Sequence, residues 1–155
     1  MQKLQIIIDT REQTPWHFPE WIADVKRGTL KTGDYAIDGD KDFAIERKSL
    51  QDFVSTMAGG WDRFCREIDR MDGWKAKVII VEGRFLDLCV TCAGGELVGP
   101  QHESYKLTPQ FIIRRISELT MKGCTVLFCE DAELASTMAI DIFKRRQEDL
   151  GIELA

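Results

Sequence analysis

The sequence lacks any long apolar run. No stretch of its 155 residues approaches the length needed to span a bilayer. The amino-terminal segment MQKLQIIIDT has one lysine and only a short apolar stretch, so it does not fit a secretory signal. Repeats and low-complexity tracts are also missing. These absences exclude an integral membrane protein and a repeat protein, and we expect a cytoplasmic protein, or a nuclear one if the source is eukaryotic, with no membrane partner.

Cysteines are few, and their number is odd. The chain has five, and with no sign of secretion we expect them to be reduced thiols. Cys89 and Cys92 form a C-x-x-C that could hold zinc together with Cys124 and Cys129. A structural zinc site normally has two tightly spaced ligand pairs, and the second pair here is widely spaced. Small buried hydrophobic residues are the better interpretation, and a zinc or redox protein is the weaker alternative.

The sequence also lacks an excess of positive charge. Its net charge is −5, which argues against a protein that coats DNA regardless of sequence, because such proteins are basic. A nuclease is not excluded, since carboxylates gathered for metal binding make a protein acidic and the metal reverses the local field. The two histidines, His17 and His102, have no ligand-like spacing. We therefore expect any metal ligands to be oxygen atoms.

Strand and helix signals alternate along the chain. Short apolar runs predict strands at residues 4–8, 24–30, 34–37, 43–48, 78–81 and 125–128. Turn residues at 38–40 join two of them into a hairpin. Apolar residues at helical spacing predict helices after the N-cap residues Ser49, Thr108 and Asp131, and also at residues 61–68 and 85–89. The sum is a single α/β domain with a central mixed sheet and helices on both faces.

Charged residues gather in the predicted hairpin. Alternate residues of a strand share a face, so Glu46 and Lys48 lie side by side on one face of their strand. Asp34 begins the partner strand and could lie close to Glu46 across the ladder, although the sequence does not fix the register. Asp9 ends the first predicted strand, and Glu12 follows three residues later.

This grouping of residue types suits phosphodiester hydrolysis. Two carboxylates can hold Mg²⁺ or Mn²⁺, which are hard cations that prefer oxygen ligands. Such an ion polarises the phosphate and lowers the pKa of a bound water. Lys48 could position that water or offset the charge on the reacting phosphorus group. Asp9 and Glu12 could complete the coordination or hold a second ion.

Three segments together resemble a known family. Ile8-Asp9-Thr10-Arg11-Glu12, Gly33-Asp34-Tyr35 and Glu46-Arg47-Lys48-Ser49-Leu50-Gln51-Asp52 look like the signature of the XPF-type structure-specific endonucleases, the ERCC-type nuclease domain. The resemblance runs from about Gln5 to Arg146, and its second half matches only in the pattern of strands and helices. It implies a restriction-endonuclease-like fold of the PD-(D/E)xK kind, with a motif half at about 4–58 and a second half at about 60–148 of one domain over 1–155.

The resemblance implies a role for each residue of the central motif. Asp34 and Glu46 would be the principal metal ligands, with the backbone carbonyl of Arg47 as a further one. Lys48 would be the catalytic lysine. The Arg47 side chain would orient the site.

It also implies roles for residues around that motif. Asp9 and Glu12 would support the metal centre as ligands, and Asp52 would orient the site. Arg11 would face DNA phosphates. Arg63 matches a basic position at which the family contacts DNA, although a solvated surface charge is an equal alternative, because the two look alike in sequence.

The chain departs from the family at its end. Eukaryotic and archaeal members have a tandem helix-hairpin-helix module after the nuclease domain, and no residues remain here for one. This leaves an excised domain or a stand-alone nuclease as the alternatives, and Met1 favours a stand-alone bacterial or phage-like protein. The expected function is a divalent-metal-dependent DNA endonuclease acting on branched or flapped DNA in repair or recombination. The alternative is a catalytically silent module that binds DNA or a partner, which the intact motif disfavours.

Two further expectations concern partners. The family pairs through its second half, and the last predicted helix has a wide apolar stripe, so we expect a homodimer, although the stripe could instead pack within one domain. Trp16 and Trp21 lie in a loop beside the acidic residues and could stack on an unpaired base, but packed tryptophans are more common. Trp61 lies on the apolar stripe of its helix and should belong to the core.

Overall fold

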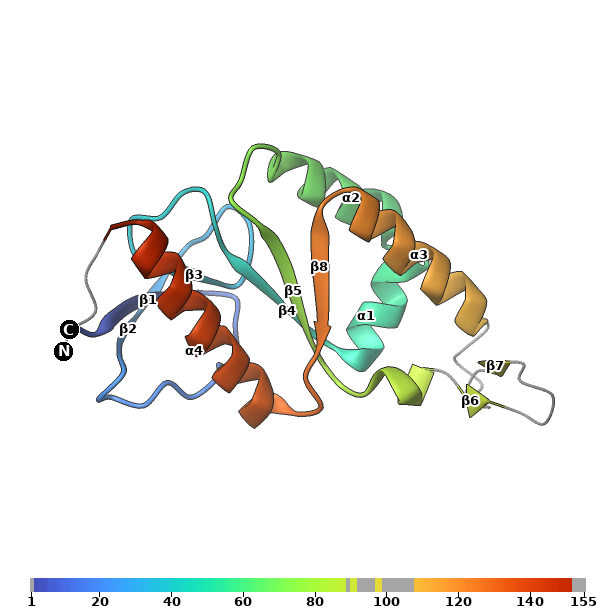
Figure 1. Ribbon diagram of the computed structural model, residues 1–155, viewed down its shortest axis with the longest axis horizontal. Helices are drawn as coiled ribbons and strands as arrows, with labels where there is room; N and C mark the ends of the chain where they lie inside the picture. Colours follow the sequence, from blue (N-terminus) through green and yellow to red (C-terminus); the bar gives the residue numbers. More distant parts are fainter. Residues whose placement is uncertain (1, 89, 92–96, 99–107, 152–155) are drawn as a thin grey trace.

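The centre of the molecule is a six-stranded sheet in the order β2-β1-β3-β4-β5-β8 (Figure 1). This computed structural model describes residues 2–88, 90–91, 97–98 and 108–151. The strands of the sheet are β1 (Leu4–Asp9), β2 (Ala23–Gly28), β3 (Tyr35–Ile37), β4 (Ile45–Ser49), β5 (Lys77–Glu82) and β8 (Cys124–Phe128). The other elements are α1 (Leu50–Met57), α2 (Trp61–Arg70), the 3-10 helix η1 (Phe85–Leu88), the paired strands β6 (Val90–Thr91) and β7 (Leu97–Val98), α3 (Pro109–Met121) and α4 (Ala132–Asp149).

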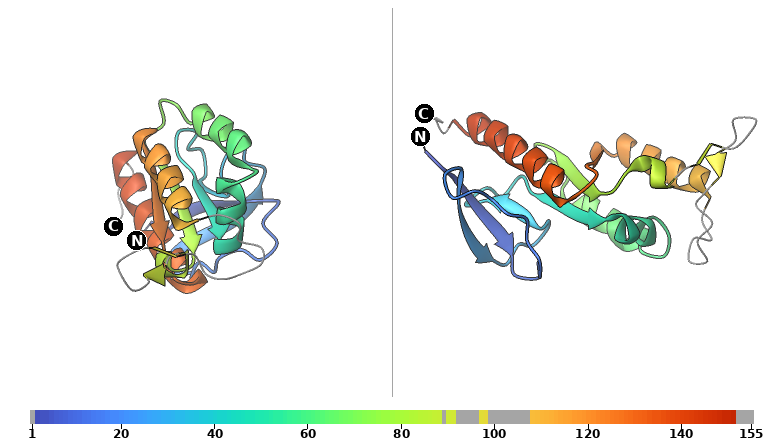
Figure 2. Two further views of the ribbon diagram at one scale, coloured as in Figure 1. Left: turned by 90° about the vertical axis from the view of Figure 1, so that its right-hand side faces the viewer. Right: turned by 90° about the horizontal axis from the view of Figure 1, so that it is seen from below.

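Helices cover both faces of the sheet and close two separate cores. On one face α4 contributes Phe143 to a core with residues of β1, β3 and β4, and on the other α1, α2 and α3 pack together. Strand β5 is apolar on both sides, because Val78 and Ile80 enter the first core while Ile79 and Val81 enter the second. Seen from below, the β1–β2 pair is turned away from β4 by the twist of the sheet (Figure 2). The single α/β domain with a mixed sheet is confirmed.

The strand directions bring several chain segments to one edge of the sheet. β3 is antiparallel to both β1 and β4, and β4 is parallel to β5. β1, β4 and β5 therefore end at the same edge, and β3 begins there. Open α/β sheets bind their ligands outside the carboxyl ends of such strands. The sequence motifs that we singled out lie at this edge.

The predicted hairpin is shorter than the sequence suggests. β3 and β4 share one paired position, Tyr35 with Ile45, and β4 does not include residues 43 and 44. In the connection, the Asp40 carboxylate accepts hydrogen bonds from Arg146 Nε at 2.6 Å and Nη2 at 2.9 Å. This ion pair, with Asp40 only 2% exposed, holds the connection against α4 instead of in the ladder.

Most other element boundaries agree with the sequence. The three predicted N-caps are confirmed: the side chains of Ser49, Thr108 and Asp131 each accept a hydrogen bond from a backbone N–H in the first turn. The strand predicted at 24–30 begins one residue earlier and ends at Gly28. The helix predicted at 85–89 is the 3-10 helix η1, and Cys89 lies outside the described residues. No helix in the described ranges is long and apolar enough to cross a membrane.

Candidate active site

Asp34, Glu46 and Lys48 meet at the edge where β1, β4 and β5 end. The backbone of Asp34 bridges its neighbours: its N–H donates to the carbonyl of Ile45 at 2.9 Å, and its carbonyl accepts from the N–H of Asp9 at 2.9 Å. Its Oδ2 accepts from the backbone N–H of Arg47 at 2.8 Å, which holds the carboxylate beside β4. Lys48 Nζ lies 3.6 Å from Glu46 Oε1 on the same face of β4.

Gly33 sets the position of Asp34. It has a φ of 86°, in the left-handed region that favours glycine. A Cβ at this position would lie 2.5 Å from the Cβ of Ala44, which is closer than real carbon atoms approach. Only glycine therefore lets the chain turn here while passing close to the segment before β4. This explains the glycine of the Gly-Asp pair in physical terms.

The two carboxylates lie in an electrostatically unfavourable position. Burial raises the pKa of Asp34, and burial together with the negative charge of Asp34 raises the pKa of Glu46. The side chains of Glu46 and Lys48 are only 12% and 14% exposed. The ammonium of Lys48, 5.3 Å from the ring centre of Phe64 in α2, lowers both pKa values without cancelling the increase. A cation bound between the carboxylates would relieve their repulsion.

The donor set fits a divalent cation that prefers oxygen. Among the described residues, no group of three or more histidine, cysteine, aspartate or glutamate side chains is arranged around a common point. Asp34 and Glu46 are thus a pair. Mg²⁺ in proteins is commonly bound through one or two carboxylates, with water and substrate phosphate completing its shell, so a pair is sufficient.

Asp9 is fully buried, and both of its oxygens have donors. Oδ2 accepts from the backbone N–H of Arg11 at 3.0 Å and from Arg11 Nε at 2.7 Å, and Oδ1 accepts from the N–H of Leu30 at 2.9 Å. Burial alone would raise the pKa of Asp9, but these hydrogen bonds and the Arg11 charge hold it below the ordinary value. In this arrangement Asp9 joins the end of β1 to the segment after β2. Arg11, 71% exposed, remains open to solvent.

Arg47 points to the opposite face of β4 from Glu46 and is the centre of a polar network. Its guanidinium forms ion pairs with Glu12 and Glu82, and its Nη1 also donates to the hydroxyl of Tyr35 and the carbonyl of Thr14. Glu12 Oε2 accepts from Tyr35 at 2.8 Å as well as from Arg47 at 3.1 Å. One carboxylate oxygen of Glu12, which was predicted as a metal ligand, thus accepts hydrogen bonds within this network.

Sequence reasoning missed two members of this network. Glu82 ends β5 and accepts hydrogen bonds from Arg47 and from the indole N–H of Trp16. Tyr35 stacks on Trp16 with ring centres 4.4 Å apart. A polar residue at the end of an apolar strand is the signal that singled out Asp9, and the same signal could have identified Glu82. Trp16 is only 4% exposed, so the base-stacking alternative is wrong for it.

The remaining predicted residues lie around these two groups. Asp52 is exposed on α1, where it borders a polar hollow of about 230 Å³ that Glu12, Arg47 and Glu82 also line. Arg63 is exposed on α2, as either of its two interpretations requires. Trp21 is 77% exposed and free to contact a ligand, whereas Trp61, at 8%, belongs to the core as predicted.

The described cysteines are free thiols in separate places. Cys124 is buried in the core under α1 to α3, while Cys129 is buried in the core under α4. Burial raises the pKa of both thiols, as expected for inert core residues. The two cannot share one ion without rearranging the sheet. Cys89, Cys92 and His102 lie outside the described residues, and His17 is exposed.

The fold is shared with solved structures. XPF from Aeropyrum pernix matches with a TM-score of 0.65 at 18% identity, over 90% of this chain and 64% of that one. XPF from Aeropyrum pernix in complex with DNA matches with a TM-score of 0.64 at 18% identity, over 95% of this chain and 66% of that one. This chain thus spans about two thirds of the length of those structures. Comparison with curated proteins finds no match. The model of the ERCC4 domain matches residues 8–140, which is most of the chain, and the protein therefore belongs to the ERCC4 domain family.

Proposed function

We propose that this protein is a divalent-metal-dependent endonuclease that cuts branched, flapped or otherwise structured DNA in repair or recombination. The observation on which the proposal depends is the meeting of two partly buried carboxylates, Asp34 and Glu46, with the Lys48 ammonium at the carboxyl edge of the sheet. Membership of the ERCC4 domain family supports the same reaction class. The DNA complex of the Aeropyrum XPF, a relative in fold, supports DNA as the substrate.

Each residue of the centre has a task in this reaction. Asp34 and Glu46 would hold the ion, with the Arg47 carbonyl as a further ligand. The ion, when bound, supplies a Lewis acid for the phosphate and an activated water. Lys48 stands beside Glu46 and stabilises negative charge that develops on the phosphate oxygens. Arg11, which is exposed and whose Nε donates to Asp9, would contact a neighbouring phosphate.

One cleavage panel tests the proposal. Labelled single-strand, duplex, flap and fork DNAs are incubated with Mg²⁺, Mn²⁺, Ca²⁺ or excess chelator. We expect cleavage with Mg²⁺ or Mn²⁺ only, most of it at the branched substrates, because Ca²⁺ takes more ligands at longer distances and is a poorer Lewis acid. Asp34→Asn and Glu46→Gln should abolish cleavage without unfolding the protein. Asp24→Asn, the same change at an exposed carboxylate of β2, is the matched control.

The alternative, a silent module that binds DNA or a partner, is also supported by one observation. Two of the four predicted ligands, Asp9 and Glu12, are hydrogen-bonded to arginine side chains, which leaves a minimal ligand pair. The same panel separates the two functions. DNA binding without cleavage under every metal condition would leave the silent module as the function, and cleavage in excess chelator would remove the metal mechanism.

We also propose that two copies of the chain pair through the second half. α4 turns Ala135, Ala139 and Phe143 into the core but leaves Leu134 and Met138 on its outer side, 51% and 41% exposed. These two side chains border a mainly apolar hollow of about 380 Å³ beside the end of β8. A dimer would bring two weak DNA contacts into one assembly, which raises affinity through effective concentration.

A further inference from the structure

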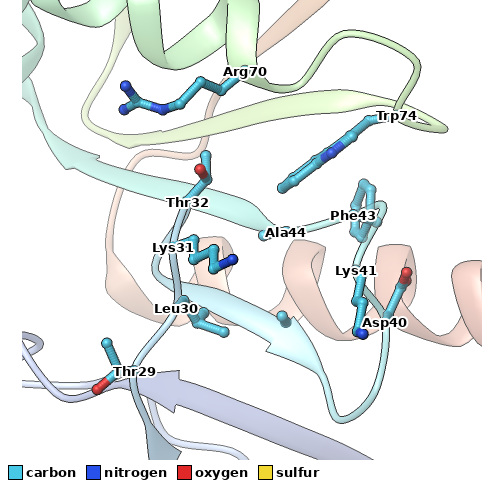
Figure 3. A pocket seen from close by; sticks show the side chains of 11 residues that line it. Thr29, Leu30, Lys31, Thr32, Asp40, Lys41, Phe43, Ala44, Arg70 and Trp74 are labelled. Carbon is cyan, nitrogen blue, oxygen red and sulfur yellow. The ribbon is translucent and has the colours of Figure 1, made fainter.

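One pocket of the described residues has Thr32 and Ala44, close sequence neighbours of Asp34 and Glu46, in its lining. Most of its lining comes from three connections, those between β2 and β3, between β3 and β4, and between α2 and β5 (Figure 3). Its volume of about 570 Å³ falls in the range of sites that hold small molecules. None of the residues that line the pocket has a role in the proposed reaction.

Three cationic side chains line the pocket. Lys31, Lys41 and Arg70 border it, and none of them forms an ion pair within the described part of the chain. The acidic residue of the lining is Asp40, whose two oxygens are both bonded to Arg146. Its charge is therefore neutralised. The pocket presents an excess of positive charge in a protein whose net charge is −5, so its ligand should be an anion.

An aromatic wall adds a second requirement. The half-buried indole of Trp74 projects into the pocket from the connection after α2, above the Phe43 ring, and Lys31 projects from the opposite side (Figure 3). An indole beside cationic side chains is the combination with which proteins hold single-stranded nucleic acid, because each base has a face that stacks and each phosphate has a charge. The lining thus offers an indole for the base of a nucleotide and cationic side chains for its phosphate.

The pocket is continuous with the carboxylate centre along the chain. Ala44 lines the pocket and lies two residues before Glu46, and Thr32 lines it two residues before Asp34. Two residues of chain span at most about 7 Å, so a strand whose phosphate lies at Asp34 and Glu46 could place an adjacent nucleotide in the pocket. Paired bases are stacked within the duplex and could not enter it, whereas an unpaired base could.

We propose that this pocket binds one unpaired nucleotide of the DNA strand next to the cleavage point, with Trp74 stacking on the base and Lys31, Lys41 and Arg70 holding the phosphate. The proposal rests on the proposed nuclease function. It gives that function a reason to prefer branched DNA, because flaps and forks offer unpaired nucleotides beside the duplex.

The test measures binding rather than cleavage. Fluorescence anisotropy in Ca²⁺ buffer gives the affinity of the whole chain for a short oligothymidylate and for an abasic oligonucleotide of the same length. We expect Trp74→Leu to weaken oligothymidylate binding about tenfold and to leave abasic binding unchanged. Lys31→Ala should weaken both and reduce the slope of log affinity against log salt by about 0.7. Lys144→Ala is the matched control, since this exposed lysine lies on the other side of α4 from Arg146.

Each outcome decides between the proposals. Thermal melting identifies variants that do not fold, and Lys31 is exposed, so its variant tests the pocket even if Trp74→Leu unfolds. Wild-type affinity in the Lys31 variant, or equal losses for the abasic strand in the Trp74 variant, would overturn the nucleotide pocket while cleavage by the wild type left the nuclease intact. Base-dependent binding by a wild-type protein that cleaves none of the DNAs would overturn the nuclease and keep the nucleotide pocket. A wild type that neither binds nor cuts would overturn both.

Discussion

The two faces of β4 place similar residues in different electrostatic conditions. On one face Glu46 and Lys48 stand with Asp34, and both carboxylates there have raised pKa values. On the other face Arg47 stands between Glu12 and Glu82, and each of these carboxylates accepts hydrogen bonds from the arginine and from an aromatic residue. Consecutive residues of one strand thus belong to two clusters. We call the face with Glu46 and Lys48 the open face, because its carboxylates have raised pKa values, and the face with Arg47 the closed face, because its carboxylates are paired with the arginine.

This difference supports the proposed assignment of the reactive face. A closed network of paired charges stabilises a local geometry, but it leaves little affinity for a further ion or a phosphate. An open cluster with raised pKa values costs folding free energy, and such clusters are common at functional sites. We infer that the Arg47 network fixes the position of β4 and of the loop after β1, and that the face with Lys48 performs the chemistry.

The largest expected effect separates the two faces by matched substitutions. Lys48→Met and Arg47→Met each remove one cation and keep an aliphatic stem. We expect Lys48→Met to lower kcat at least 100-fold. It should lower the free energy of unfolding by less than Arg47→Met does, because Glu46, whose pKa is already raised, can take up a proton when it loses this partner. Arg47→Met should lower that free energy by about 3 kcal/mol, because Glu12 and Glu82 lose their partner.

Urea unfolding and single-turnover cleavage measure the two quantities for both variants. If Lys48→Met were the more unfolded protein, or if Arg47→Met were fully stable but inactive, the assignment of the two faces would be reversed.

The second prediction tests how the open face is held in place. Gly33→Ala puts a methyl group against Ala44 at a positive φ, whereas Gly39→Ala meets nothing within 4 Å at a similar φ of 85°. In both variants the alanine must adopt the left-handed conformation, which lowers the free energy of unfolding by about 1 kcal/mol. Gly33→Ala should cost about 2 kcal/mol more and shift Asp34, with a loss of cleavage that Gly39→Ala does not share. Equal stability and activity of the two variants would show that the close approach is unimportant.

The third prediction uses the pKa of the open face. Burial, followed by the Asp34 charge, raises the pKa of Glu46 from 4.5 to about 8 in the folded protein. Between these values the folded state holds a proton that the unfolded state has lost, so the free energy of unfolding of the metal-free protein should fall as pH rises through this window. Glu46→Gln should flatten this slope, and Glu82→Gln should not. Urea midpoints at about pH 5 and about pH 8 give the slope, and identical slopes in wild type and Glu46→Gln would contradict the raised pKa.

Much of the open face could be predicted from the sequence because it depends on local geometry. The alternation of a strand places Glu46 beside Lys48, and the glycine-aspartate pair places Asp34 at a turn. The partners of the closed face come from distant segments: Glu82 reaches Arg47 only because β5 is the neighbour of β4. The order of strands is not encoded in any local pattern, so the network was not visible, although a packed Trp16 was the favoured interpretation.

The pocket beside Trp74 was hidden for the same reason. Most of its lining comes from three connections. The connection that contains Asp40 is held against α4 by the ion pair with Arg146 and by the contact of Phe43 with Phe143. That ion pair joins residues 106 positions apart, and it also ends the predicted hairpin early. A sequence pattern can identify turn residues there, but not the helix that holds the turn.

The smallest expected effect concerns the two sides of α4. The inner side is buried in the core, and the outer side leaves Leu134 and Met138 exposed. Leu134→Lys with Met138→Lys places charges on the outer side only, and both residues are already partly exposed, so folding should change little. If that side is the homodimer contact, light scattering at micromolar concentration should give twice the single-chain mass for wild type and the single-chain mass for the double variant. Val25→Lys, at an exposed apolar residue of edge strand β2, is the control and should stay dimeric. A single-chain mass for wild type at every concentration would mean that α4 leaves apolar surface exposed for another purpose, and the nuclease would then act as a monomer.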